Sequence, residues 1–307
     1  MTMKTKLLPV GFYDLLFDEA QKTHQNINAL LEIFFSREYK LIKTPLVEFE
    51  ENFAPQEVTN SFRATDIISG KNLVFRSDIT LQIARLLSTR LGSQHTPLKL
   101  CYVGDVLCAK SENLYADRQQ TQVGVEIIDC DQEKSNFEII EISLAALQKL
   151  SLKNLLIEFS LPDFLGIFLA EISAQKNEEL AAAILQKNLS AIKNLAAENA
   201  EIISKIALQN DNLENLAAEI LQKFSSEKVS KELQRAQKIS QFLREKFSSV
   251  EVRFDLFGDH KSSYHQEISF DVFCGNFPYA IARGGRYKIN NRNAVGATIY
   301  MNALRKI

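Results

Sequence analysis

Cysteine is scarce in this sequence, and the few cysteines that occur lie far apart. They are Cys101, Cys108, Cys130 and Cys274. No C-x-x-C pair occurs among them, and no histidine lies at a zinc-ligand spacing from any of them. We therefore expect reduced thiols, no metal site and no cofactor.

Long apolar runs and an excess of positive charge are also lacking. No stretch approaches the ~20 consecutive apolar residues of a membrane-spanning helix, and Met1 to Lys6 are polar. We therefore expect a soluble, cytoplasmic protein without a membrane partner. Lys and Arg total 36 against 38 Asp and Glu, for a net charge of -2. Nucleic-acid binders usually carry a basic excess, so the charge does not support a tRNA partner.

Proline and glycine are nearly absent from one long tract, at about residues 163–247. This tract has no proline and a single glycine, and its Leu and Ile residues recur three and four apart. It predicts a helical insertion domain, with residues 1–162 and 248–307 forming the core domain. The apolar stripes favour a packed bundle over the alternative of a binding groove, because such stripes are mostly core.

The remaining sequence predicts an α+β fold, with a mostly antiparallel sheet flanked by helices and interrupted by the insertion. Helices are expected at 18–37, 79–87 and 137–150, and from Ala297 to the end. Strands are expected at 73–76, 98–107, 122–128, 155–159, 250–257, 268–274 and 279–283, with 98–128 as a long-looped hairpin. Pro45 places the segment 40–49 at an edge or an interface, because proline cannot donate to a strand ladder.

Four segments resemble the core of class II aminoacyl-tRNA synthetases, in the histidyl branch. They are LPVGFYD from Leu8 with KTPLVE from Lys43, FRSDITLQIAR from Phe75, CYVGDVL from Cys101 with RQQTQVGVE from Arg118, and ARGGRY from Ala282 with AVGA from Ala294. Their order and spacing across nearly the whole chain carry the resemblance. It implies a six- or seven-stranded antiparallel sheet flanked by helices, and a dimer formed through the first helix and strand.

The resemblance also implies which catalytic residues are missing. Adenylation needs arginines, whose planar fork binds phosphate oxygens in pairs. The three positions that carry these arginines in the family fall on Cys108, near His260 and on Ala303. Lys110, Lys261 and Arg305 lie nearby, but lysine lacks the fork. We therefore expect no catalytic residues and no adenylation activity.

The amino-acid pocket of the family is better preserved. By resemblance, the histidine-binding residues are Asp78, Thr80, Arg118, Gln122, Glu126, Tyr264, Gly284 and Gly285. Alternatives remain open from the residues alone. Asp78 can be a helix cap, Glu126 can pair with Arg118 across the hairpin, and the two glycines can serve a tight turn between strands.

The sequence ends at Ile307, so we expect no anticodon-binding domain of the kind that histidyl-tRNA synthetases carry. The whole pattern resembles the regulatory subunits of ATP phosphoribosyltransferase. That family implies a non-catalytic subunit, required for the first step of histidine biosynthesis and bound to the short-form catalytic subunit in a hetero-octamer. Histidine would act as a feedback effector. The alternatives are a truncated histidyl-tRNA synthetase paralogue that ligates an amino acid to a non-tRNA acceptor, and a binding module without a ligand.

Overall fold

A computed structural model describes residues 7–92, 97–111, 117–129, 131–172, 177–208, 212–224, 226–258 and 265–307. The chain forms two compact units. Unit 1 comprises Met1–Asp131, Ile139–Ser151 and Ile289–Ile307, and unit 2 comprises Gln132–Glu138 and Leu152–Lys288. No helix in these described ranges is long and apolar enough to cross a membrane.

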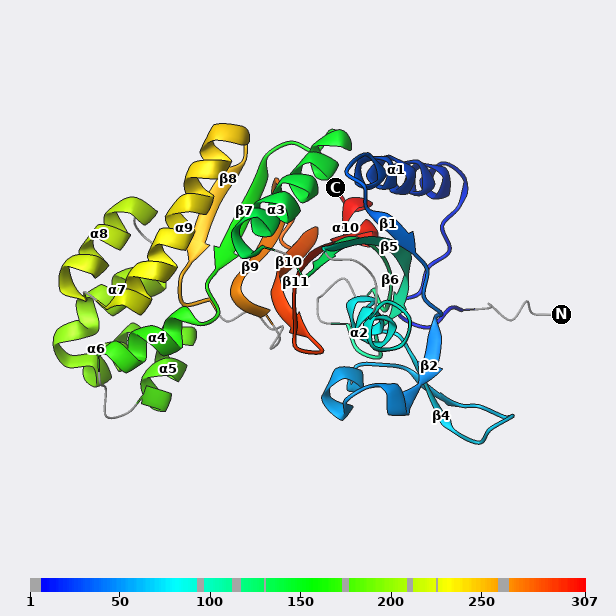
Figure 1. Ribbon diagram of the computed structural model, residues 1–307, viewed down its shortest axis with the longest axis horizontal. Helices are drawn as coiled ribbons and strands as arrows, with labels where there is room; N and C mark the ends of the chain where they lie inside the picture. The colour runs from blue at the N-terminus through cyan, green and yellow to red at the C-terminus, as the bar shows by residue number, and fades with distance from the viewer. Residues whose placement is uncertain are drawn as a thin grey trace. The chain divides into compact units, whose positions relative to one another are not determined.

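Unit 1 contains four neighbouring strands in the order β1 (Lys40–Ile42), β5 (Leu98–Leu107), β6 (Gln119–Ile128) and β11 (Arg292–Tyr300). β1 pairs parallel with β5, and the other two pairings are antiparallel. The predicted hairpin is therefore confirmed, and β1 lies at the edge of the sheet, as Pro45 indicates. Helix α1 (Phe17–Ser36) packs on β5 and β6, and Figure 1 shows helix α2 (Thr80–Thr89) on the opposite face of these strands.

The central strand β6 is buried on both faces, and its two faces differ in chemistry. Val123, Val125 and Ile127 are buried apolar residues, whereas the alternate positions hold Gln122, Gly124 and Glu126. Successive side chains of a strand point to opposite faces, so one face of β6 is apolar and the other is polar. The apolar face contributes to the core, and the polar face carries the buried Gln122 and Glu126.

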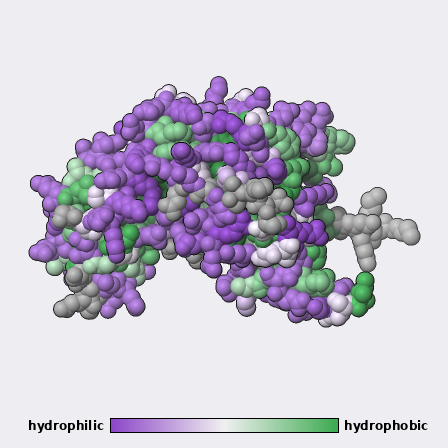
Figure 2. Space-filling view, viewed as in Figure 1, coloured by the Kyte–Doolittle hydropathy of each residue, from purple (hydrophilic) through white to green (hydrophobic). Residues whose placement is uncertain are grey.

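A second, three-stranded sheet of unit 1 has the order β2 (Val47–Phe49), β4 (Asn72–Phe75) and β3 (Arg63–Thr65). The 3₁₀ helices η1 (Glu50–Asn52) and η2 (Pro55–Val58) follow β2. The turn between β3 and β4 exposes Ile67 and Ile68 at 98% and 96%. This apolar tip is visible at the lower right of Figure 2.

Unit 2 contains strands in the order β10 (Ala282–Ile289), β9 (His265–Cys274), β7 (Leu155–Ser160) and β8 (Glu251–Asp255), of which only β7 and β8 pair in parallel. Helix α3 (Gln132–Lys149) begins in unit 2 and continues into unit 1. The helical tract forms α4 (Phe164–Glu171), α5 (Asn177–Leu185), α6 (Leu189–Ala196), η3 (Ala197–Asn199), α7 (Ala200–Leu208), α8 (Leu213–Lys223) and α9 (Glu227–Lys246).

The apolar stripes of these helices form one buried cluster, as expected for a packed bundle. Phe168 is fully buried and lies edge-on to Phe224 and Phe257, with ring centroids 4.9 and 5.4 Å away. Leu161 and Leu256, which flank β7 and β8, belong to the same cluster. The helices and the strands of unit 2 therefore share a core.

Two of the predicted elements are wrong. Gly284 and Gly285 do not form a turn but lie within β10, opposite Phe270 and Ser269 of β9. The turn instead uses Asn290 and Asn291, with φ of 49° and 62°, and asparagine tolerates this left-handed conformation. The terminal helix does not begin at Ala297, because Ala297 pairs with Val125 in β11, and α10 spans only Met301–Leu304. Strand pairing here overrides the helical preference of alanine.

Candidate ligand-binding site

The candidate site lies on the polar face of β6. Directly paired residues of antiparallel strands share a face. Gln122 is paired with Gly104 and Tyr300, Gly124 with Tyr102 and Thr298, and Glu126 with Leu100 and Gly296. Gln122 and Glu126 are only 3% and 2% exposed. Two long polar side chains therefore stand on the sheet with a glycine between them.

The segment Asp78–Thr80, which follows β4 and includes the first residue of α2, lies over this face. The Ile79 amide donates to Gln122 Oε1 at 3.2 Å, and Gln122 Nε2 donates to Asp78 Oδ2 at 3.4 Å. The Thr80 hydroxyl donates to Glu126 Oε1 at 3.0 Å. The structure therefore brings together Asp78, Thr80, Gln122 and Glu126, four of the residues that the resemblance implies.

Asp78 also contacts the start of α2, although the N-cap of this helix is Ile79 and not, as the alternative interpretation proposed, Asp78. Its Oδ1 accepts the amide of Thr80, the first residue of α2, at 2.7 Å. A carboxylate in this position satisfies one of the free amides at a helix start. Asp78 therefore contacts both the helix start and the site, because one oxygen accepts from Thr80 and the other accepts from Gln122.

Tyr102 and Thr298 also belong to the site, although the sequence did not identify them. The Tyr102 hydroxyl lies 2.7 Å from Thr298 Oγ1 and donates to Glu126 Oε1 at 3.5 Å. Tyr102 covers Gly124, where a Cβ atom would overlap the phenol ring. Gly296 makes room for Glu126 in the same way, because a Cβ there would overlap the carboxylate. The contacts depend on strand register, for which the sequence carries no local signal.

Burial governs the protonation of the site. It raises the pKa of Asp78 above its ordinary value, against the lowering effect of the Thr80 and Gln122 hydrogen bonds. Burial, together with the nearby charges of Glu126 and Asp78, raises the pKa of Tyr102 well above its ordinary value. Tyr102 is therefore a hydrogen-bond donor, and a cationic group would relieve the desolvation of Asp78.

Arg118 lies elsewhere and has other partners. Its guanidinium is 4.6 Å from the Phe62 ring centroid and 5.5 Å from that of Phe12, and Nε donates to the Cys108 carbonyl at 3.3 Å. Arg118 directly precedes β6, so roughly 26 Å of extended chain separates it from Glu126 at about 3.3 Å per residue. The proposed ion pair between Arg118 and Glu126 is therefore wrong, since it would need these residues side by side.

The remaining predicted residues fall in several different parts of the chain. Gly284 and Gly285 belong to β10 of unit 2. Tyr264, His260 and Lys261 lie outside the described residues. Cys108 Sγ donates to the Ser77 carbonyl at 3.9 Å, Ala303 belongs to α10, and Arg305 pairs with Glu19 at 3.3 Å. Lys110 is held through its backbone by Asn60.

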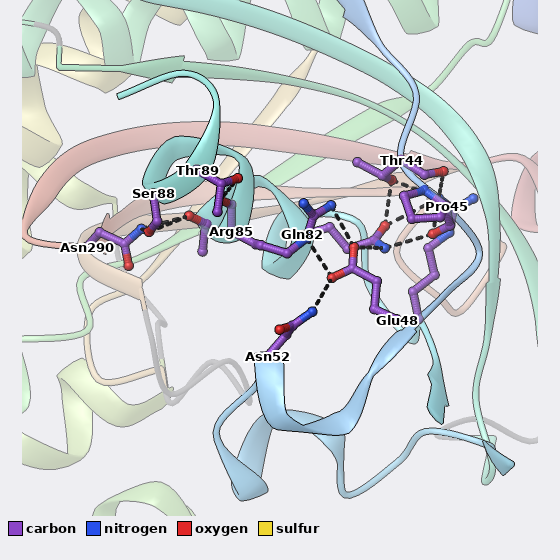
Figure 3. A network of polar contacts seen from close by, with 11 residues as sticks. Thr44, Pro45, Glu48, Asn52, Gln82, Arg85, Ser88, Thr89 and Asn290 are labelled. Atoms are coloured by element: carbon purple, nitrogen blue, oxygen red, sulfur yellow. Dashed lines mark hydrogen bonds and ion pairs between the residues drawn. The ribbon is translucent and has the colours of Figure 1, made fainter. Parts of the chain in front are cut away.

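A buried polar network lies beside the site, around Gln82 of α2 (Figure 3). Gln82 is fully buried, donates to Glu48 Oε1 at 2.7 Å and to the Pro45 carbonyl at 2.8 Å, and accepts from the Thr44 hydroxyl. Arg85 binds both oxygens of Glu48, at 2.7 and 2.8 Å. The network therefore anchors α2 to β2 and to the connection that precedes β2.

Comparison with known proteins agrees with this architecture. The family model described as histidyl-tRNA synthetase matches residues 11–304. A solved ATP phosphoribosyltransferase regulatory subunit/histidyl-tRNA synthetase from Bacillus halodurans has a TM-score of 0.84 at 21% identity, over 98% of this chain and 83% of that one. The ATP phosphoribosyl transferase (HisG:HisZ) complex from Thermotoga maritima has a TM-score of 0.73 at 19% identity, over 91% and 97%. The fold is therefore that of a class II, histidyl-tRNA synthetase-like core.

Sequence relatives show which family within this histidyl-tRNA synthetase-like class the chain belongs to. The ATP phosphoribosyltransferase regulatory subunit of Caldanaerobacter subterraneus is 31% identical over 91% of this chain and 75% of its own length. That of Gluconobacter oxydans is 30% identical over 99% of this chain and 81% of its own length. Within the histidyl-tRNA synthetase-like class, the chain belongs to the family of ATP phosphoribosyltransferase regulatory subunits.

Proposed function

We propose that this chain activates a short-form ATP phosphoribosyltransferase catalytic subunit in the cytoplasm and contributes to the first step of histidine biosynthesis. The observation that carries the proposal is the family relationship, which extends over nearly the whole chain at about 30% identity and so includes the sheet, the site and the helical tract. In this role the chain performs no chemistry itself, and its effect is on the partner's activity.

The proposed loss of adenylation rests on the resemblance to the synthetase family, which puts two of the arginine positions at Cys108 and Ala303. Neither side chain can neutralise a phosphate. The Cys108 thiol donates to the Ser77 carbonyl at 3.9 Å. The protein should therefore give no ATP–pyrophosphate exchange with histidine. An exchange signal lost in Asp78→Asn would instead favour the amino-acid ligase.

Histidine is the proposed effector, bound on the polar face of β6. Asp78 and Glu126 supply carboxylate oxygens for its ammonium group, and Thr80 and Gln122 hold these carboxylates in place. Charge-assisted hydrogen bonds of this kind are stronger than neutral ones. The assignment of Tyr264, Gly284 and Gly285 to the histidine site stays a prediction.

The proposed assembly contains a dimer of this chain, formed through α1 and β1, within a hetero-octamer with the catalytic subunit. Phe35 of α1 and Leu41 of β1 are each 48% exposed, and β1 is an edge strand with an unpaired side. Phe35→Glu should therefore convert the dimer into a monomer, which sedimentation velocity would measure. A dimer unchanged by this charge would place the interface elsewhere.

Reconstitution with a short-form catalytic subunit tests the function directly. Phosphoribosyl transfer to ATP should increase when the chain is added, and histidine should inhibit the complex. Asp78→Asn should keep the activation and lose the inhibition, whereas Arg292→Lys, an ion-pair change at Asp129, should keep both. Failure of the wild-type chain to bind or activate the catalytic subunit would reject the proposed role.

A further inference from the structure

The segment that carries Asp78 and Thr80 is held at both of its ends. Gln82 follows it and belongs to the buried network around Glu48. Arg76 precedes it and reaches two other parts of unit 1 at once. Its Nε donates to the Asp105 carbonyl of β5 at 2.6 Å, and its Nη1 donates to the Thr44 carbonyl and hydroxyl at 3.0 and 2.9 Å.

The backbone of Arg76 is anchored to the same surroundings. Its amide donates to the Leu46 carbonyl at 3.0 Å, and its carbonyl accepts from the Leu107 amide at 2.9 Å. Nη1 also approaches Gln82 Oε1 at 3.3 Å. Arg76 therefore connects β5, the Thr44–Leu46 connection and α2, and a guanidinium with five donors in one plane suits such branched contacts.

Gly104 is what allows Arg76 to lie here. Gly104 pairs with Gln122 across β5 and β6, so both are on the site face of the sheet. A Cβ atom built on Gly104 would overlap Nη2 of Arg76 and lie 3.1 Å from its Cζ. The guanidinium therefore occupies the place of a side chain at position 104, beside the residue that binds both Asp78 and the Ile79 amide.

We propose that Arg76 is a positioning residue of the ligand site, which acts by holding the Asp78–Thr80 segment in register with Gln122 and Glu126. The inference rests on the proposed histidine site for its functional consequence. The Nε and Nη1 donors of Arg76 are directed to Asp105, Thr44 and Gln82, and not to the carboxylates of the site. Its contribution is to keep the carboxylate of Asp78 in place before a ligand arrives, which lowers the ordering cost of binding.

The first test replaces Arg76 with lysine, which keeps the charge but lacks the planar fork of five donors. Arg76→Lys should weaken histidine binding, measured by calorimetry, at least tenfold. The matched control is Arg292→Lys, which changes a half-buried arginine of unit 1 bound to Asp129 at 2.6 Å. The control should bind histidine within twofold of wild type. Equal affinities for all three proteins would overturn the inference.

Gly104→Ala provides a second variant that leaves Arg76 in the chain. The new methyl group displaces the guanidinium, so the loss of affinity should match that of Arg76→Lys. The double variant should bind no more weakly than either single variant, because each removes the same contact. Losses that multiply in the double variant would show that the two positions act separately.

A readout that does not involve histidine separates this inference from the proposed function. Hydrogen exchange of the Ile79 and Thr80 amides, followed on peptides spanning them, should be at least tenfold faster in Arg76→Lys and Gly104→Ala than in Arg292→Lys. These amides donate to Gln122 and Asp78. If wild type fails to bind histidine, the effector role is rejected, and the exchange rates still decide whether Arg76 positions the segment. Unchanged exchange would refute the positioning role.

Discussion

Substitution of Gly296 by alanine is expected to destabilise the protein through a single contact. A Cβ atom at this position of β11 would overlap Oε2 of Glu126 and lie 2.8 Å from Oε1. Glu126 is buried and holds the Thr80 hydroxyl at 3.0 Å, so its carboxylate has to move and break this bond. Histidine binding should be lost together with the bond.

The expected magnitude has two parts. Loss of a buried hydrogen bond to a charged group costs about 1.5–3 kcal/mol, and an added methyl group in a packed interior costs about 1–3 kcal/mol. Because partial relaxation shares these costs, we expect the free energy of unfolding to fall by about 2–5 kcal/mol. Urea denaturation followed by circular dichroism would measure it, since the chain has no tryptophan to report by fluorescence.

A matched glycine gives the opposite sign. Gly166 is an exposed residue of helix α4, and a Cβ atom built on it meets nothing within 4 Å. Gly166→Ala should therefore increase stability by about 0.5–1 kcal/mol, the usual cost of glycine inside a helix. The reasoning is refuted if the free energy of unfolding changes equally and in the same direction in the two variants. It is also refuted if Gly296→Ala unfolds with a free energy within about 0.5 kcal/mol of wild type.

Three further predictions follow from the site and its surroundings. Because burial raises the pKa of Asp78, this residue contributes to stability at pH values below its unfolded pKa. The contribution is lost as the pH rises through the folded pKa. Asp78→Asn should therefore be at least as stable as wild type at pH 7, and any gain in stability should vanish below about pH 4. The variant should also bind histidine at least tenfold more weakly. Urea titrations at both pH values would measure the stability, and calorimetry would measure the binding. Arg118→Ala removes the contacts to Phe12 and Phe62, so chymotrypsin should cut near Phe12 faster while histidine affinity stays within twofold. Burial raises the pKa of Cys101 to about 11, so iodoacetamide at pH 8 should label it at least tenfold more slowly in the native than in the urea-unfolded protein.

Local patterns were sufficient for the elements whose signal lies in consecutive residues. The period of Leu30 and Phe34 predicts α1, whose observed bounds differ from the predicted ones by one residue at each end. The two apolar runs at 98–107 and 122–128 predict a hairpin that the structure contains. Elements with ambiguous patterns were assigned wrongly. The alanine-containing run at Ala297 is compatible with a helix or a strand. It forms a strand because it pairs with β6.

The candidate site shows the same division between local and nonlocal information. Resemblance to the family identified Asp78, Thr80, Gln122 and Glu126, because the motifs that carry them are contiguous in sequence. Tyr102 was missed because its contact with Thr298 joins residues far apart in the chain. Arg118 was assigned to the same site because it belongs to the same motif as Gln122. Its side chain instead lies against aromatic rings from two other segments.

The sequence by itself therefore determined the alternation of polar and apolar residues along β6 and the motifs that define the family. Only the tertiary structure decided which residues of β5 and β11 lie opposite Gln122, Gly124 and Glu126. The physical reason is that side chains alternate with a period of two along a strand, whereas the register between strands is set by pairing over long sequence distances. A slip of one residue in that register would place Gly296 away from Glu126 and close the space that the carboxylate occupies.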